Sequence, residues 1–169
     1  MPLKNSYTDL KVSCLAHLCD ILRLEILYEH GGIYSDLDVI WLRNPIEYFK
    51  HKIVIGFTNS SYKILCNAVM MAEKEHPALL QYRDWLISIM PCKKYWTPAN
   101  PYKLWKDNLD VTMVGRKEFF PIPYNRMDTL EFEKVKNSIC VHLFCSMNDI
   151  ESILRRSAFV NFYLPDNLG

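Results

Sequence analysis

The segment "YEHGGIYSDLDV", residues 28–39, constrains the fold more than any other part of the chain. Before its two glycines, leucine and isoleucine recur at spacings of three and four, which predicts a helix over about residues 8–29. A glycine pair is a typical helix stop signal. After it, "IYSDLDVIWL" is rich in β-branched and aromatic residues and predicts a strand over residues 33–42, with a break near the two acids. The chain must therefore pass from a helix into a strand within a few residues.

Helix and strand patterns go on alternating along the chain, which favours an α/β fold. The 169 residues contain no internal repeat, low-complexity tract or linker, and this length suits one domain with one core. We therefore expect a single domain over residues 1–169, with an uncertain, irregular tail from about residue 148. Further strands are predicted at residues 52–57, 67–72, 111–114 and 138–144, and further helices at residues 77–90, at residues 102–108 and within the tail.

Composition and charge exclude several functional classes. Half of the residues are hydrophobic and 23% are charged, which is typical of a folded chain rather than a disordered one. The net charge of +1 provides no field that would recruit nucleic acid, so no nucleic-acid partner is expected. No stretch approaches the ~18 apolar residues of a membrane span. The six cysteines show no CxxC spacing, which argues against a zinc knuckle and leaves free thiols and disulfides both open.

The first predicted helix places Asp20 and Arg23 among apolar residues. Asp20 and Arg23 lie three positions apart and are therefore neighbours on the helix surface. Because the helix is apolar on nearly all sides, we expect it to be buried, and buried charges need partners. Either the two residues form a structural ion pair, or both face a polar cleft that also receives Asp36 and Asp38.

Asp36 and Asp38 form the second unusual feature of this region. Alternate residues of a strand share a face, so Tyr34, Asp36 and Asp38 are expected to point the same way. Two adjacent carboxylates repel each other, and their burial is unfavourable unless a cation or hydrogen-bond donors compensate. A hydrated pair at an exposed strand end is the plain alternative. Two oxygen ligands with open coordination positions suit Mg²⁺ or Mn²⁺ bound together with substrate phosphates.

The whole stretch "CDILRLEILYEHGGIYSDLDVIWL", residues 19–42, resembles the DXD-region signature of a glycosyltransferase family. This family includes α-1,4-galactosyltransferases, α-1,4-N-acetylglucosaminyltransferases and yeast α-mannosyltransferases, and glucosylating bacterial toxins share the same arrangement. Its pattern is a helix with S/C-D-x-x-R, a glycine pair, and a strand with Y-x-D-x-D. The residues in register with this pattern are Asp20, Arg23, Gly31, Gly32, Tyr34, Asp36 and Asp38.

The resemblance implies a GT-A-like, Rossmann-like fold and a metal-dependent transfer that retains the configuration at the anomeric carbon. The sugar would pass from a nucleotide-sugar donor to a glycan, glycolipid or protein acceptor, with Mn²⁺ or Mg²⁺ as the cofactor and a UDP-sugar favoured over a GDP-sugar. Asp20, Arg23, Asp36 and Asp38 would be the catalytic residues. Asp20 and Arg23 would hold the donor sugar together with Tyr34, and the two DXD carboxylates would hold the metal and the diphosphate.

Two later segments extend the resemblance. "NAVMMAEKEHPALL" is similar to the family's strand-to-helix segment, which makes Asn67 a candidate donor-binding residue, although a turn residue at a strand start is an equal alternative. "SICVHLFCSM" is similar to a late family segment and makes His142 a candidate for the metal and diphosphate site. A buried core histidine is the alternative there. Phe144 and Met147 stand where the family tends to have tryptophan.

The N-terminus departs from the family pattern. Family members carry a strand–helix–strand unit before the first helix described above, whereas only a short lead precedes it here, so we expect a GT-A-like domain without part of that unit. The compartment stays open, with the Golgi or secretory lumen expected if a longer anchored form exists and the cytoplasm otherwise.

Two other functions compete with a transferase. One is a shortened domain that binds metal and nucleotide sugar without catalysis. The other is a phosphohydrolase with Asp36 as nucleophile and Asp38 as general acid and base. The long helix before the acids, the "VIW" after them and the absence of a late acidic pair disfavour the phosphohydrolase.

Overall fold

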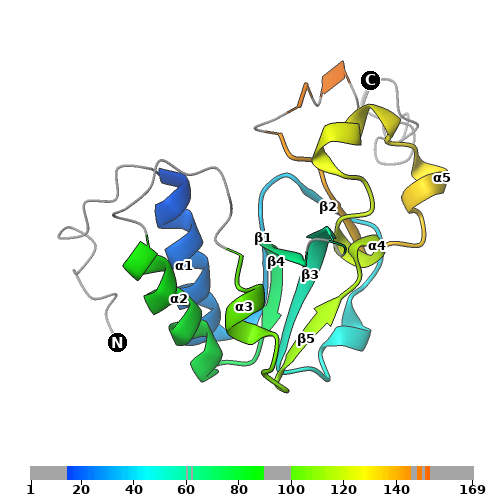
Figure 1. The fold of residues 1–169 in the computed structure, drawn as a ribbon. Coiled ribbons are helices and arrows are strands. Elements are labelled where there is room, and N and C mark those ends of the chain that lie inside the picture. The colour runs from blue at the N-terminus through cyan, green and yellow to red at the C-terminus, as the bar shows by residue number, and fades with distance from the viewer. Residues whose placement is uncertain are drawn as a thin grey trace, which may run out of the picture.

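The structure is a computed structural model that describes residues 15–59, 61, 63–89, 100–145, 148–149 and 151–152. Its elements alternate between helix and strand, so the predicted α/β class is confirmed (Figure 1). The helices are α1 (Leu15–His30), α2 (Pro77–Ile89), α3 (Tyr102–Trp105), α4 (Arg116–Phe119), α5 (Phe132–Val135) and the 3₁₀ helices η2 (Ile46–Tyr48) and η4 (Tyr124–Thr129). The strands are β1 (Gly32–Ser35), β2 (Val39–Trp41), β3 (Ile53–Asn59), β4 (Ile64–Ala72), β5 (Val111–Val114) and β6 (Cys140–His142).

The described strands form two sheets. The larger sheet is mixed and has the order β1-β4-β3-β5, in which β4 is antiparallel to both neighbours and β5 is parallel to β3. The smaller sheet pairs β2 with β6 in antiparallel register, with Val39 opposite His142. Because β1, β3 and β5 run in one direction, their carboxyl ends lie at the same edge of the larger sheet, and the acid pair follows directly after β1.

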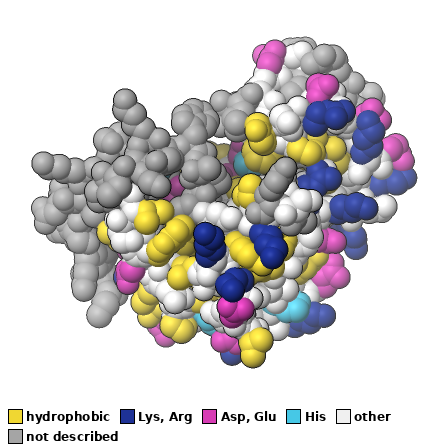
Figure 2. All heavy atoms as spheres, viewed as in Figure 1, with side chains coloured by type: hydrophobic (Ala, Val, Ile, Leu, Met, Phe, Trp, Pro, Cys, Tyr) yellow, Lys and Arg dark blue, Asp and Glu magenta, His cyan; other side chains and the backbone are white. Residues whose placement is uncertain are grey.

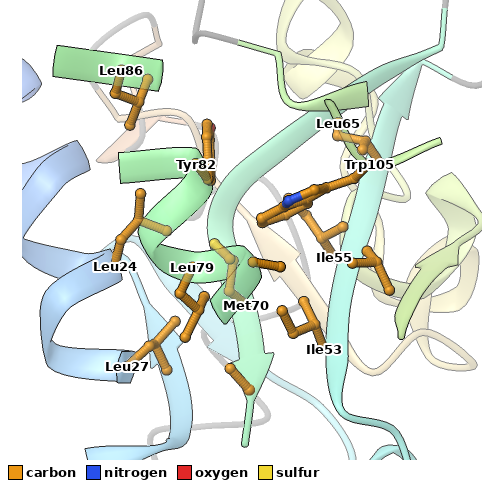
Figure 3. Close-up of a cluster of buried hydrophobic side chains, with 13 residues drawn as sticks. Leu24, Leu27, Ile53, Ile55, Leu65, Met70, Leu79, Tyr82, Leu86 and Trp105 are labelled. Atoms are coloured by element: carbon orange, nitrogen blue, oxygen red, sulfur yellow. The ribbon is translucent and has the colours of Figure 1, made fainter. Parts of the chain in front are cut away.

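Helices α1 and α2 lie side by side over one face of the larger sheet (Figure 1). Figure 3 shows the core between them and the strands, where Trp105 reaches toward the side chains of β3 and of α2. Trp105 and Tyr82 are both fully buried, and their rings meet edge to face at 4.9 Å. Such aromatic pairs add to the free energy of area burial alone. This core fixes α1, and with it Asp20 and Arg23, against the sheet.

The other face of the larger sheet is covered by α4 and the small sheet. Phe119 and Phe120 pack there against Val54, Val69 and Cys140. A third cluster, which includes Met127, Leu130 and Val141, lies under η4 and α5. Lys and Arg side chains gather on the surface near α4 and α5 (Figure 2), where Lys134 and Lys136 pair with nearby glutamates.

Several predicted elements need correction. The strand predicted over residues 33–42 is two strands, β1 and β2, divided at the acid pair where a break was expected. The helix predicted over residues 102–108 ends at Trp105, and the strand predicted over residues 138–144 is limited to β6. Strands β3, β4 and β5 and helix α2 agree with the predictions, whereas residues 8–14 of the first helix and most of the tail lie outside the described residues.

Helix α1 is not buried on all sides, contrary to the prediction. Ile21, Leu24 and Leu27 are buried with Arg23, but Ile26 on another side is 48% exposed. Among the described elements, the larger sheet and α2 cover the buried side of the helix. In the part of the chain that the structure describes, no helix is both long enough and apolar enough to cross a membrane.

Candidate functional site

The two acids are brought together by a tight turn between the sheets. The backbone N–H of Asp36 donates to Ala68 O at 2.8 Å, so the β1–β4 pairing continues up to this residue. The Val39 N–H then donates back to Asp36 O at 3.3 Å, which closes the turn around the exposed Leu37. Asp38 thus precedes β2 rather than continuing β1. Tyr34, Asp36 and Asp38 converge as expected, but a turn rather than strand alternation brings Asp38 beside Asp36.

Asp36 is held by two residues that the sequence pattern singled out. Its Oδ1 accepts a hydrogen bond from the Tyr34 hydroxyl at 2.8 Å and lies 3.1 Å from Arg23 Nη1. The Arg23 guanidinium also lies over the Tyr34 ring, 4.6 Å from its centroid, a favourable cation–π geometry. One carboxylate oxygen of Asp36, Oδ1, is therefore held by the side chains of Tyr34 and Arg23. None of the interactions found among the described residues occupies its Oδ2.

Arg23 is the centre of a buried polar network. Only 6% of this residue is exposed. Its Nη2 lies 3.2 Å from Asp20 Oδ1, its Nη1 donates to Asn67 O at 2.7 Å, and its Nε donates to Cys19 O at 3.3 Å. The Asn67 side-chain amide donates to Asp20 Oδ1 at 3.0 Å, which closes the network. Asn67 is thus buried and bonded to both Asp20 and Arg23 of α1.

The pKa values in this network reflect burial balanced by charge. Burial raises the pKa of Asp20, and the nearby Arg23 and the Asn67 amide only partly offset this effect. Burial would lower the pKa of Arg23, but the carboxylates of Asp20 and Asp36 outweigh it and raise that pKa. The guanidinium therefore stays charged at every relevant pH.

Asp38 lies on the other side of the acid pair, against β6. Its backbone oxygen accepts from the Leu143 N–H at 2.9 Å, and its Oδ1 lies 3.1 Å from His142 Nε2. Its Oδ2 accepts from the Cys145 N–H at 2.9 Å. Burial raises the pKa of Asp38, but the hydrogen bonds from His142 and Cys145 outweigh it and lower the pKa to about 2. This carboxyl is therefore ionised at neutral pH.

Asp36, Asp38 and His142 form a group that could hold one divalent cation. One ligand atom from each lies within 4.8 Å of the others. Metal–ligand distances of about 2.0–2.1 Å in an octahedron place neighbouring ligand atoms about 3 Å apart and opposite ones about 4.2 Å apart. The 3.1 Å between His142 Nε2 and Asp38 Oδ1 is a neighbouring-ligand distance. Carboxylate oxygens suit Mg²⁺ and Mn²⁺, and the imidazole nitrogen suits softer divalent ions.

Formal charges give a second reason to place a cation here. Asp20, Asp36 and Asp38 contribute three negative charges, and Arg23 contributes one positive charge. With neutral imidazole, these four side chains carry an excess of two negative charges, and partly buried charges of one sign are unfavourable without a counterion. A divalent cation matches this excess.

The structure brings all seven sequence-predicted site residues into one region. Five of them form the bonded network around Arg23, and Asp38 and His142 adjoin it across the acid pair; the five are Asp20, Arg23, Tyr34, Asp36 and Asn67. His142 is buried, as expected of a core histidine, and its ring nitrogen Nε2 also contacts Asp38. Sequence reasoning missed Ala68 and Cys145, because both contribute backbone atoms whose position no residue type signals.

Comparison with known protein families agrees with this region. Residues 2–60 match the family described as "Glycosyltransferase sugar-binding region containing DXD motif". The match includes α1, β1, the acid pair and β2, and ends before Asn67 and His142. Comparisons with curated proteins and with solved structures find no match. Residues 2–60 are thus similar to this glycosyltransferase sugar-binding region, and Asp36-Leu37-Asp38 is the DXD motif within the matched segment.

Proposed function

We propose that this chain transfers a sugar from a nucleotide-sugar donor to an acceptor, in a reaction that depends on Mn²⁺ or Mg²⁺. The observation that carries this proposal is the cluster of Asp36, Asp38 and His142, with ligand atoms within 4.8 Å of one another, beside a region matched to sugar-binding glycosyltransferases. The excess of two negative charges supports a divalent ion in that cluster. The proposal includes a GT-A-like arrangement acting as a single domain over residues 1–169.

The residues of the site divide the proposed work between them. A divalent cation held by Asp36, Asp38 and His142 would neutralise the charge that develops on the departing diphosphate. Asp38 would remain ionised throughout, because its pKa is about 2. Asp20 and Arg23 would lie on the donor-sugar side, where Asn67 fixes both through hydrogen bonds and the Tyr34 ring packs under the Arg23 guanidinium. As implied by the family resemblance, we propose a UDP-sugar donor, retention at the anomeric carbon, and a glycan, glycolipid or protein acceptor.

The proposal is tested first by binding. Isothermal titration of UDP-sugars into the full chain, with and without Mn²⁺, should show metal-dependent binding. Absence of binding below millimolar concentrations in the presence of Mn²⁺ would refute the transferase proposal. Binding without release or transfer of sugar would instead identify the chain as a nucleotide-sugar-binding domain without catalysis.

Turnover provides the second test. Asp36→Asn and Asp38→Asn each remove one anionic ligand and should lower metal-dependent sugar release by at least about a hundredfold, since charge stabilisation of a leaving group is worth several kcal/mol. Asp107→Asn is the matched control, because Asp107 is exposed and pairs only with Lys106 among the described residues. Full activity in both DXD variants would contradict the assignment. Phosphatase turnover without nucleotide-sugar binding would favour the phosphohydrolase.

A further inference from the structure

Phe144 lies directly against the imidazole of His142. The two ring centroids are 4.1 Å apart and the rings are inclined by 47°. Phe144 lies two residues after His142, beyond the end of β6. Its backbone is left-handed, with φ of +53°, a conformation that side chains other than glycine seldom adopt. The chain thus turns at the end of β6 and folds the Phe144 ring back onto His142.

Among the described residues, His142 has no protein partner for the hydrogen bond that usually orients a metal-binding histidine. Its Nε2 faces Asp38 at 3.1 Å, whereas its Nδ1 is buried without a hydrogen-bond partner in the part of the chain that is described. Metal-binding histidines almost always donate their second ring N–H to a carboxylate, a backbone carbonyl or water, and this bond fixes the ring. Ring packing is a second kind of contact that can fix an imidazole.

Aromatic packing is the contact available for this purpose. Phe144 covers the imidazole, and Phe120 meets it edge to face at 5.9 Å. Phe144 is itself held, because Tyr124 packs against its ring at 6.2 Å and the Asn148 side-chain amide donates to its backbone oxygen at 3.1 Å. Phe144 is one of three described non-glycine residues with a positive φ, with Lys63 and Glu75, and its ring lies against a candidate metal ligand.

We propose that Phe144 is the positioning residue for His142. Its ring, placed by the left-handed backbone, holds the imidazole so that Nε2 points to Asp38 and to a cation bound there. This inference rests on the proposed function only in assuming that His142 is a metal ligand.

Three substitutions separate the ring of Phe144 from its backbone conformation. Phe144→Gly removes the ring but accepts a φ of +53° without steric cost. Phe144→Leu removes the ring, and its side chain still disfavours the positive φ. Phe144→Trp keeps an aromatic ring at this position. Phe57→Leu is the matched control, because Phe57 makes its ring contact with Tyr102 at 6.0 Å rather than with any candidate ligand.

The measurement is titration of Mn²⁺ alone into the full-length chain, together with the visible spectrum of bound Co²⁺ and thermal unfolding without metal. Phe144→Gly and Phe144→Leu should weaken Mn²⁺ binding about tenfold, the size of effect seen when groups that orient metal ligands are lost. Both should also change the Co²⁺ spectrum. Without metal, Phe144→Gly should unfold at a temperature no lower than Phe144→Leu. Phe144→Trp should stay within about threefold of the parent affinity, and Phe57→Leu should match the parent.

The proposal is overturned if Phe144→Gly binds Mn²⁺ with the parent affinity and spectrum, or if Phe57→Leu loses as much affinity as Phe144→Gly. His142→Ala in the same titration separates the two levels of the argument. If His142→Ala weakens binding and Phe144→Gly does not, only the positioning role fails. If His142→Ala binds like the parent, the positioning role and the ligand assignment fail together. If the metal data agree but no sugar is transferred, the proposed function fails and the positioning role stands.

Discussion

Arg23 holds two carboxylates of the site in place, those of Asp20 and Asp36. Its planar guanidinium offers five donors in a fixed arrangement, and here they reach Asp20, Asp36, Asn67 and a helix carbonyl at once. A lysine ammonium at the same position could not span the two carboxylates in this way. Because Arg23 is buried, its removal would leave carboxylates in a poorly solvated place without their cation.

Replacement of Arg23 should therefore destabilise the fold as well as the site. Arg23→Gln should lower the free energy of unfolding by about 3–5 kcal/mol, the usual result when one partner of a buried ion pair is removed. Arg23→Lys should give an intermediate loss. Urea unfolding of the metal-free protein measures both. Arg43→Gln serves as the control, since Arg43 is exposed and should change stability by no more than about 0.5 kcal/mol. Parent stability in Arg23→Gln would contradict the buried network.

The cysteines provide a prediction about pH. Burial raises the pKa of the Cys66 thiol to about 12, and burial likewise raises that of Cys140 to about 12, whereas Cys145 is exposed. Only the thiolate reacts with iodoacetamide, and at pH 8 roughly one in 10⁴ of the Cys66 groups would be ionised. A rise from pH 8 to pH 10 still lies below that pKa, so the thiol form should persist.

Peptide-resolved mass spectrometry after iodoacetamide treatment tests this expectation. In the native protein Cys145 should be alkylated first, and Cys66 and Cys140 should remain unmodified at pH 8 and at pH 10. In guanidinium chloride all three should react alike. Equal native rates for Cys66 and Cys145 would show that Cys66 is not buried as described.

Spacing alone predicted part of this residue-level arrangement. Asp20 and Arg23 could be paired because residues three apart on a helix are neighbours. The hydrogen bonds between Asn67 and the same pair, one accepted from Arg23 and one donated to Asp20, join positions 44 and 47 apart in sequence, and no local pattern encodes such a contact. The family resemblance made Asn67 a candidate site residue. It did not predict that the Asn67 side chain would form hydrogen bonds with Asp20 and Arg23 of α1.

At the level of elements, the turn from α1 into β1 depends on two left-handed glycines. Gly31 has φ of +66° and Gly32 has φ of +92°. The Gly31 N–H still bonds to Leu27 O at 2.8 Å, as at a helix end. A Cβ on Gly31 would lie 2.8 Å from the backbone nitrogen of Lys74, so the chain after β4 approaches this glycine closely. The turn places Tyr34 and Asp36 beside Arg23.

Gly31→Ala should consequently be costly. The left-handed backbone disfavours an L residue by roughly 1–2 kcal/mol, and the close contact with Lys74 adds about 1–3 kcal/mol. We expect a loss of about 2–5 kcal/mol in urea unfolding. Gly115→Ala is the matched control, because Gly115 has φ of −63° and open space around its Cβ position, and should stay within about 1 kcal/mol. Similar losses in both variants would argue against the close approach at Gly31.

Element ends were predicted less well than element types. The strand predicted over residues 138–144 stops at His142 because β2 offers only three residues to pair with and because Phe144 turns left-handed. The break between β1 and β2 was visible in sequence, since two adjacent acids rarely continue a strand. The exposed side of α1 could not be predicted from the sequence, because exposure depends on which elements cover the helix.

For the whole molecule, the candidate metal site joins two sheets. Asp36 ends the hydrogen-bonded part of β1 in the larger sheet, whereas Asp38 and His142 belong to the small β2–β6 sheet. The contact between Asp38 and His142 spans 104 positions in sequence. Only the complete fold brings these ligands together, so a cation at this site should stabilise the packing of the small sheet on the larger one.

Mn²⁺ should therefore raise the global stability of the chain. A ligand that binds only the folded state stabilises it by RT ln(1 + [L]/Kd), which is ~2.7 kcal/mol at a concentration a hundredfold above Kd. For a chain of this size, each kcal/mol corresponds to roughly 2–4 °C in Tm, so a shift of about 5–10 °C is expected at saturating Mn²⁺. The shift should grow with the logarithm of the Mn²⁺ concentration, disappear with EDTA, and be lost in Asp38→Asn and His142→Ala. An equal shift in those two variants would mean that Mn²⁺ acts elsewhere on the molecule, since neither could then be holding the ion that joins the sheets.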